Sequence, residues 1–227
     1  MSKLRAIFGG TFNPVHNGHI GAIKQLDGLL GFHSVHFVLS ARPPHKDEVT
    51  ATIEQRFSML ELALLDYPHY YPDDAEIRRK EKSYTVDTVE TFKRRYPNSR
   101  LVIVIGLDSL QRLSTWHLID DWIDQINWVV LDRPGYELTE SFAYQSRLTD
   151  DLEELKSAEG GKIWQFQESK FNISSTELRQ KLASDYNIDR TTVTANTDST
   201  VVSSAVVDNL NPQVLEFIHF NDLYKTK

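Results

Sequence analysis

The chain has 227 residues and no cysteine, which excludes disulfide bonds, thiolate metal sites and a cysteine nucleophile. Hydrophobic residues make up 40% of the sequence, enough for a real core and too many for a disordered chain. The formal net charge is −7 and Lys and Arg form no long block, so a general nucleic-acid-binding protein is disfavoured. No apolar run reaches the length of a membrane span and the N-terminus carries no long apolar leader, so we expect a soluble, unexported, cytoplasmic protein.

Short apolar segments alternate with helical patterns through the first half of the chain. The strand candidates are Leu4–Phe8, Val35–Leu39, Leu101–Ile105 and Trp128–Leu131. The helix candidates between them are Ile20–Leu30, Ile53–Asp66, Val86–Tyr96 and Leu118–Ile126. Such alternation predicts βαβ units and a Rossmann-like α/β fold: a doubly wound, mainly parallel sheet with helices on both faces. The length suits one domain over residues 1–227.

The pattern is weaker in the second half. Leu148–Ala158 is typical of an acidic surface helix, and Lys162–Phe166 of a further strand. Ser174–Leu182 and Pro212–Phe220 have clear helical patterns, the second closing the chain. Residues 185–207 between them are rich in Thr and Ser without a helical period, which predicts an inserted loop or a small hairpin.

The segment from Gly9 to His19 joins the first strand to the first helix. Gly9 and Gly10 lack a Cβ, so a phosphate can approach the backbone where unpaired N–H groups favour an anion. His16 and His19 are three residues apart, which places both rings on nearly the same helix face. The segment matches neither a Walker A loop nor the dinucleotide fingerprint. Its His-x-Gly-His pattern resembles the signature of the nucleotidyltransferase superfamily; the alternative is a glycine turn with two solvated histidines.

A second constellation opens the helix at Ser174. Ser174 and Glu177 have the spacing of a capping box, which on its own indicates only a helix start. The hydroxyls of this turn also favour an anion, and Arg179 in the second turn points back toward it. Arg179 could therefore bind a phosphate with two nitrogens, and a surface arginine without a ligand is the alternative.

Further motifs occur in a fixed order between these two. They are Pro43-Pro44-His45-Lys46, Ser83-Tyr84-Thr85-Val86-Asp87-Thr88, Gly106-Leu107-Asp108-Ser109-Leu110, Trp116 and Arg133-Pro134-Gly135. Together with the first and last motifs, they resemble the bacterial nicotinate-nucleotide adenylyltransferases over residues 4 to about 183. The resemblance implies that the phosphate of nicotinate mononucleotide attacks the α-phosphorus of ATP. Nicotinate adenine dinucleotide and pyrophosphate form, with Mg²⁺ assisting and no metal ligand assigned to a protein side chain.

The resemblance also implies roles for single residues on the ATP side. His16, His19 and Arg179 would hold the phosphates and the charge that develops on them. A phosphate in contact with either histidine should raise the pKa of that ring. Phe12 is either a mobile gate or a core aromatic. The residues expected at ATP are Gly9, Gly10, Thr11, Phe12, Gly106, Asp108, Arg133, Ile173, Ser174 and Ser175.

The mononucleotide side is expected at His45, Lys46, Tyr84, Thr85 and Trp116. The backbone at Tyr84–Thr85 would receive the nicotinate carboxylate, and a plain N-cap at Thr85 is the alternative. Trp116 would stack on the pyridine ring, with a core tryptophan as the competitor. Two short basic clusters, Arg78-Arg79-Lys80 and Lys93-Arg94-Arg95, are typical of solvated faces.

Other functions remain open at this point. A nicotinamide mononucleotide or pantetheine-phosphate adenylyltransferase, a cytidylyltransferase, or a non-catalytic nucleotide sensor would share the scaffold. A tRNA synthetase is disfavoured because the chain is short and acidic. We expect no nucleic-acid or membrane partner, and either a monomer or a homodimer. The connection before the last helix is longer than the family pattern, so the resemblance gives no guidance on the C-terminal surface.

Overall fold

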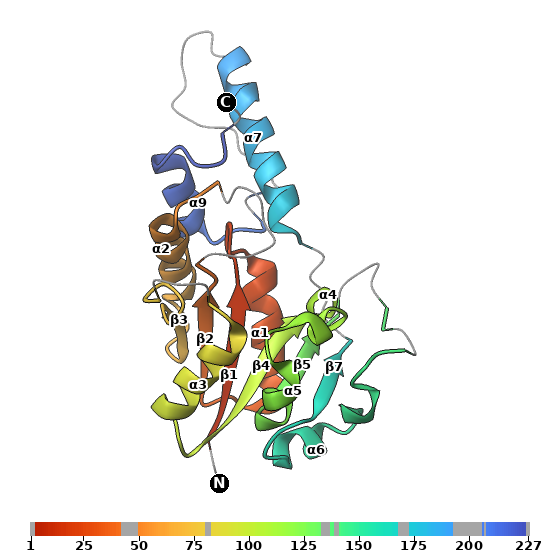
Figure 1. Cartoon of the computed structure of the whole chain (residues 1–227). Coiled ribbons are helices and arrows are strands. Elements are labelled where there is room, and N and C mark those ends of the chain that lie inside the picture. Colours follow the sequence, from red (N-terminus) through yellow and green to blue (C-terminus); the bar gives the residue numbers. More distant parts are fainter. Residues whose placement is uncertain are drawn as a thin grey trace.

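A seven-stranded sheet with the order β3-β2-β1-β4-β5-β7-β6 forms the centre of the molecule (Figure 1). Every neighbouring pair of strands is parallel. The computed structural model describes residues 3–41, 50–79, 83–132, 137–138, 141–167, 173–192, 206 and 208–225, with side chains in the 173–192 segment described up to 184. The strands are β1 (Lys3–Gly10), β2 (Ser34–Leu39), β3 (Tyr70–Asp73), β4 (Ser99–Gly106), β5 (Asn127–Leu131), β6 (Leu148–Thr149) and β7 (Ile163–Phe166).

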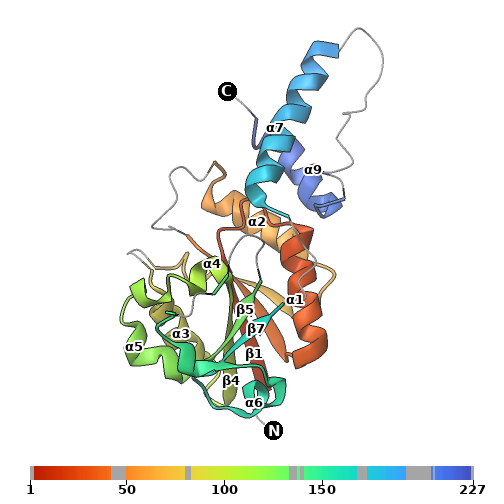
Figure 2. The same ribbon diagram turned by 90° about the vertical axis from the view of Figure 1, so that its right-hand side faces the viewer.

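Helices cover both faces of this sheet (Figures 1 and 2). One face carries α1 (Asn17–Leu30) and α2 (Ile53–Leu64), and the other carries α3 (Thr85–Arg95), α4 (Leu107–Leu110) and α5 (Ile119–Trp122). The last helix, α9 (Pro212–Phe220), packs against α2 beside the base of α7 (Figure 2). Successive strand residues point to opposite faces, so Ala6 and Phe8 join one core while Ile7 joins the other. The sequence prediction of a doubly wound sheet is therefore confirmed.

Two further helices follow β6 and β7 in the chain. The short α6 (Leu152–Ser157) precedes β7, and α7 (Ser175–Thr192) extends from the carboxyl edge of the sheet well beyond the body of the molecule (Figure 2). Leu178 and Leu182, near its base, are buried in the same core as α1. None of the described helices is both long and apolar enough to cross a membrane.

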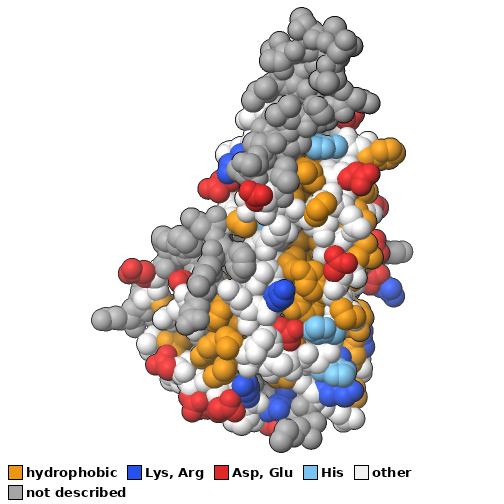
Figure 3. Space-filling view, turned by 180° about the vertical axis from the view of Figure 1, so that it is seen from behind, with side chains coloured by type: hydrophobic (Ala, Val, Ile, Leu, Met, Phe, Trp, Pro, Cys, Tyr) orange, Lys and Arg blue, Asp and Glu red, His pale blue; other side chains and the backbone are white. Residues whose placement is uncertain are grey.

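The face opposite to that of Figure 1 shows hydrophobic side chains in patches between charged ones (Figure 3). Among the described side chains of this face, Lys and Arg are scattered rather than gathered into one basic surface. This distribution agrees with the acidic composition of the chain.

Several sequence predictions of local structure are wrong. The strand β3 was not predicted, because it is short and contains Pro72, which argues against a strand. The helix predicted for Leu118–Ile126 is broken: α5 ends at Trp122, whose φ of −135° is not helical, and a short 3-10 helix follows. The surface helix predicted for Leu148–Ala158 begins with β6, and its Leu155 is fully buried.

The helix that begins at Ser175 is longer than predicted. It continues past Leu182 to Thr192, so the first part of the predicted 185–207 loop is helical. Apart from residue 206, the stretch from 193 to 207 lies outside the described residues. The division of the chain into one domain with an insertion stays a prediction.

Candidate active site

The strand order reverses its direction between β1 and β4, and two of the predicted motifs follow these two strands. β1 ends at Gly10 and β4 at Gly106, while α1 and α4 begin after them. Ligands of doubly wound sheets bind beyond the carboxyl ends of the strands at such a switch point. The glycines expected near ATP therefore lie where the fold itself favours a ligand.

The two histidines stack on each other at the start of α1. His16 is the N-cap of the helix and has an extended backbone, and His19 lies one turn further. Their ring centroids are 3.6 Å apart with an angle of 25° between the planes. The N–H of His16 donates to Nδ1 of His19 at 3.2 Å, so neutral His19 carries its proton on Nε2. The predicted common face is thus present.

Burial separates the two rings electrostatically. His16 is only 5% exposed, whereas His19 is half-buried. Burial lowers the pKa of His16 from 6.5 to about 4, so this imidazole is neutral near pH 7. Within the described residues its Nδ1 has no hydrogen-bond partner. The expected rise of the histidine pKa depends on a phosphate beside the ring, and it stays a prediction.

The glycines of this loop differ in what they make room for. A Cβ at Gly9 would meet no protein atom within 4 Å, whereas a Cβ at Gly10 would lie 2.8 Å from the Phe12 ring. A Cβ at Gly18 would lie 3.0 Å from Nδ1 of His16 and 3.3 Å from Cβ of Ile173. The protein's own packing therefore leaves no room for a side chain at Gly10 and little at Gly18, whereas Gly9 faces open space.

Phe12 belongs to the core. It is 2% exposed, has a φ of 45°, and its ring lies against Phe8 and His19 at centroid distances of 5.7 and 5.2 Å. Of the two alternatives given by the sequence, the structure favours the core aromatic. A role of Phe12 at ATP stays a prediction.

The start of α7 is capped as the sequence predicts. The N–H of Glu177 donates to the hydroxyl of Ser174 at 3.3 Å. The hydroxyl of Ser175 donates to the carbonyl oxygen of Pro14 at 3.0 Å. Thr176 accepts a hydrogen bond of 3.3 Å from Arg179. The hydroxyls of this turn thus have partners within the protein.

Arg179 ties α7 to the histidine loop. Its Nη1 donates to the carbonyl oxygen of Asn13 at 2.8 Å. Ile173, just before α7, lies against Gly18 between the two histidines. The guanidinium and the imidazoles therefore belong to one assembly, although they come from opposite ends of the sequence.

Two residues of this assembly were missed. Arg56 of α2 is 1% exposed and donates from Nη1 to the carbonyl oxygens of Thr11 and Ser40, each at 2.8 Å. Tyr224 donates to Oδ1 of Asn13 at 2.8 Å. A lone arginine in a helix and a tyrosine near the chain end carry no local signal that predicts these contacts.

Of the residues expected at the mononucleotide, Tyr84 and Thr85 open α3. Tyr84 is the N-cap and Thr85 the first helical residue, so the predicted N-cap at Thr85 is wrong by one position. The Tyr84 ring stacks on His117 with centroids 4.3 Å apart. Trp116 is half-buried, 6.3 Å from Trp122 between centroids. Both alternatives for Trp116 thus stay open.

At the end of β4, Gly106 is the N-cap of α4. A Cβ there would lie 2.6 Å from Oδ1 of Asp108, so the glycine makes room for that carboxylate. Asp108 pairs with Arg112 at 3.8 Å. Three expected residues lie outside the described part of the chain: His45, Lys46 and Arg133.

Residues 7–181 match the cytidylyltransferase-like family. A protein of Klebsiella pneumoniae named probable nicotinate-nucleotide adenylyltransferase is 37% identical over 188 residues, which cover 80% of this chain and 87% of that protein. The chain belongs to the cytidylyltransferase-like family, among the nicotinate-nucleotide adenylyltransferases. A member of Salmonella typhimurium named nicotinate-nucleotide adenylyltransferase is also 37% identical, over 80% of this chain and 88% of that protein.

The fold of the family is also seen in solved structures. The nicotinic acid mononucleotide adenylyltransferase of Plasmodium falciparum, complexed with NaAD, superposes with a TM-score of 0.72. The match covers 98% of this chain and 97% of that chain at 18% identity, so it supports the fold alone. The family resemblance stated from the sequence is confirmed by the family match over residues 7–181 and by the relatives at 37% identity.

Proposed function

We propose that this protein transfers the AMP moiety of ATP to nicotinate mononucleotide, forming nicotinate adenine dinucleotide and pyrophosphate. In this reaction a phosphate oxygen of the mononucleotide bonds to the α-phosphorus of ATP. The bond from that phosphorus to the bridging oxygen of the leaving pyrophosphate breaks. The nucleophile belongs to the substrate, so the protein has to position two anions and stabilise charge. The relatives at 37% identity carry this activity in their names.

The observation that carries the proposal is the joining of two distant motifs at the switch point of the sheet. His16 and His19 stack on each other after β1, and Arg179 donates to the Asn13 carbonyl oxygen of the same loop. In the proposal, His19 donates from Nε2 to a phosphate oxygen of ATP, because its Nδ1 already accepts a hydrogen bond. Gly9 leaves open space in front of the strand end, which a phosphate needs for close approach.

His16 would respond to the phosphate rather than carry a charge beforehand. Its burial favours the neutral ring, and an adjacent anion favours the imidazolium. ATP binding would therefore be accompanied by proton uptake at pH values between the pKa of His16 in the free protein and the higher pKa of His16 beside the phosphate. Arg179 would act on the same loop both by its charge and by holding the Asn13 carbonyl.

The start of α3 would receive the mononucleotide. The first N–H groups of a helix have no partner within it and favour an anion, such as the nicotinate carboxylate. Trp116 and the Tyr84–His117 stack provide aromatic surface nearby for the pyridine ring. The roles of these residues, and of His45, Lys46 and Arg133, are part of the proposal.

Mg²⁺ would enter with ATP. Enzymes of this kind generally use a divalent ion, and the described residues include no group of three or more His, Asp or Glu that could hold one. Mg²⁺ commonly binds substrate phosphates together with few protein ligands. When bound, it would neutralise phosphate charge. A cytoplasmic location and a monomeric or dimeric state stay predictions.

Pyrophosphate release tests the proposal directly. The protein is incubated with ATP, Mg²⁺ and either nicotinate mononucleotide or nicotinamide mononucleotide. We expect fast release with the acid and slow release with the amide. The absence of turnover with the acid would reject the function, and faster turnover with the amide would reject the specificity.

A further inference from the structure

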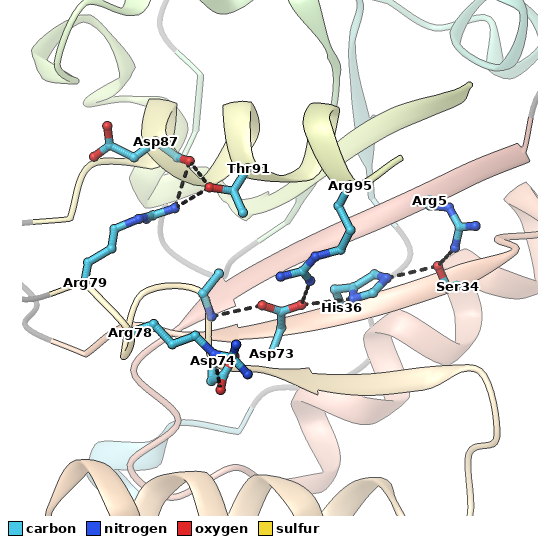
Figure 4. A network of polar contacts seen from close by, with 11 residues as sticks. Arg5, Ser34, His36, Asp73, Asp74, Arg78, Arg79, Asp87, Thr91 and Arg95 are labelled. Atoms are coloured by element: carbon cyan, nitrogen blue, oxygen red, sulfur yellow. Dashed lines mark hydrogen bonds and ion pairs between the residues drawn. The ribbon is translucent and has the colours of Figure 1, made fainter. Parts of the chain in front are cut away.

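Two adjacent arginines, Arg78 and Arg79, have opposite surroundings although they belong to one basic cluster. The Arg78 side chain is 76% exposed and pairs with Asp74 at 2.7 Å. Arg79 turns away from it toward the first turns of α3 (Figure 4). The sequence interpretation of this cluster as a solvated face is therefore wrong for Arg79.

The guanidinium of Arg79 makes four hydrogen bonds to the start of α3. Nη1 donates to the hydroxyls of Ser83 and Thr88, at 3.0 and 2.9 Å. Nη2 donates to the carbonyl oxygen of Asp87 at 2.8 Å and to the hydroxyl of Thr91 at 2.9 Å. A planar guanidinium fixes several acceptors in one geometry, which a lysine ammonium cannot reproduce. Arg79 therefore sets the position of the helix start.

This helix start lies at the ligand edge of the sheet. The helix of a crossover connection runs opposite to the parallel strands, so α3 begins near their carboxyl ends. The N–H of Tyr84 already donates to Oδ2 of Asp87 at 2.9 Å. The next N–H groups, those of Thr85 and Val86, have no partner within the helix. They are the groups offered to the mononucleotide carboxylate in the proposed function.

Charge at this position also depends on Arg79. Its four acceptors are uncharged oxygens, and no carboxylate of the described residues forms an ion pair with it. The carboxylate of Asp87 is close by, and on its own it would repel an anion. Burial raises the pKa of Glu76 to about 7, while the charge of Arg79 opposes that rise. The arginine therefore supplies positive charge that offsets these acidic groups.

We propose that Arg79 is a positioning residue for the mononucleotide and a determinant of its acid preference. It holds the first turn of α3 in the geometry that receives the carboxylate, and it supplies positive charge behind that turn. A carboxylate gains from both effects, whereas a neutral amide gains from the geometry alone. The inference rests on the proposed function.

The far end of α3 offers a structural comparison. Arg95 donates to Asp73 at 2.5 Å, and Asp73 in turn contacts the buried His36 at 3.3 Å (Figure 4). This contact anchors the end of α3 to β2 and β3, away from the helix start. Loss of Arg95 would therefore loosen the helix without changing the groups offered to a ligand.

The test compares Arg79→Gln with two matched variants, Arg78→Gln and Arg95→Gln. Steady-state rates are measured with ATP and with each mononucleotide, and thermal unfolding is followed in parallel. We expect Arg79→Gln to raise the KM for nicotinate mononucleotide about tenfold and to change the KM for ATP less than about twofold. The ratio of kcat/KM between acid and amide should fall about fivefold. Arg79→Lys, which keeps the charge, should retain more of this ratio than Arg79→Gln.

Several results would overturn the inference. One such result is an Arg79→Gln variant in which the KM for ATP and the KM for nicotinate mononucleotide change equally. Another is an Arg95→Gln variant whose KM values match those of Arg79→Gln. A third is an Arg79→Gln variant with the same KM values and the same acid-to-amide ratio of kcat/KM as Arg78→Gln. If Arg79→Gln does not fold, Thr91→Val removes one of its acceptors, and an unchanged mononucleotide KM would count against the inference. Failure of the wild type to use nicotinate mononucleotide would instead remove the proposed function itself.

Discussion

The two sides of the proposed site are held in different ways. The loop after β1 is fixed by side chains from far along the chain. Ser175 and Arg179 bind the carbonyl oxygens of Pro14 and Asn13 across separations of 161 and 166 residues. Tyr224 reaches Asn13 across 211 residues. The ATP side therefore depends on the C-terminal part of the fold.

The start of α3 is held locally instead. The four acceptors of Arg79 lie only 4 to 12 residues further along the chain. Local contacts form without closing a long loop, whereas distant ones require the sheet and both helix layers first. Substitutions in α7 and near the C-terminus should thus change the use of ATP and leave the mononucleotide largely unaffected.

The largest effect is expected on the ATP side, at His19. His19→Ala removes the Nε2 donor proposed for the phosphates, so kcat should fall about 100-fold or more while the fold survives. The KM values of both substrates should change little, because the contact strengthens in the transition state. Steady-state pyrophosphate-release assays give kcat, and circular dichroism shows whether the variant is folded. A folded variant with the wild-type kcat would remove His19 from catalysis.

Acid should weaken the loop after β1 through His16. Burial lowers the pKa of this ring from 6.5 to about 4, so the unfolded chain binds the proton more readily between these values. The stability contribution is fully present above pH 6.5, and it is lost as the pH falls toward 4. From pH 7 to pH 5 the loss should be about 2 kcal/mol.

Urea unfolding at a series of pH values measures this term. His16→Gln has no titrating ring, so its stability should fall less steeply with acid than that of the wild type. The remaining titratable groups affect the wild type and His16→Gln equally, so their contributions cancel in the difference between the two unfolding free energies. Parallel curves for the two proteins between pH 7 and pH 5 would contradict the role of His16.

Arg179 tests the distant clamp on the ATP side. Arg179→Met removes a charged donor from the Asn13 carbonyl and should lower kcat/KM for ATP about tenfold. The KM for the mononucleotide should stay within about twofold of the wild type. Isothermal calorimetry with each substrate alone separates the effect on ATP binding from the effect on mononucleotide binding. An equal loss for both substrates would erase the distinction between the two sides.

Gly9 tests whether open space at the strand end is used by a ligand. A Cβ there meets no protein atom within 4 Å, so Gly9→Ala should leave the melting temperature nearly unchanged. It should nevertheless raise the KM for ATP about fivefold, because a phosphate could no longer approach the backbone. Gly10→Ala is the control: its Cβ would crowd Phe12 and should destabilise the fold. Unchanged ATP binding in Gly9→Ala would place the phosphates elsewhere.

Much of this arrangement could be predicted because short stretches of the sequence determine it. Buried parallel strands are short apolar runs, and the Ser174 capping box and the His16–His19 spacing are read over a few residues. The fold then follows from alternation, and the site from the rule for switch points. These elements needed no knowledge of distant partners.

The features that were missed depend on contacts that only the folded chain brings together. Arg56 resembles any helical arginine until β1 and β2 bring carbonyl oxygens around it. Arg79 resembles its exposed neighbour Arg78 until α3 folds against it. The strand β3 lacks a strong pattern and depends on pairing with β2. Tertiary contacts overrode the local signal in each case.

Tyr224 contacts Asn13 from the far end of the chain, and its substitution gives the smallest expected effect. Tyr224→Phe removes one buried hydrogen bond to Asn13 and should cost about 1 kcal/mol of unfolding free energy. The Asn13 side chain would keep its contact of 3.5 Å to Thr50, so the loop should loosen only slightly. The KM for ATP should rise about twofold, with the mononucleotide KM unchanged. A variant that affected only the mononucleotide would show that the chain end acts on α3, and that the two sides are not held independently.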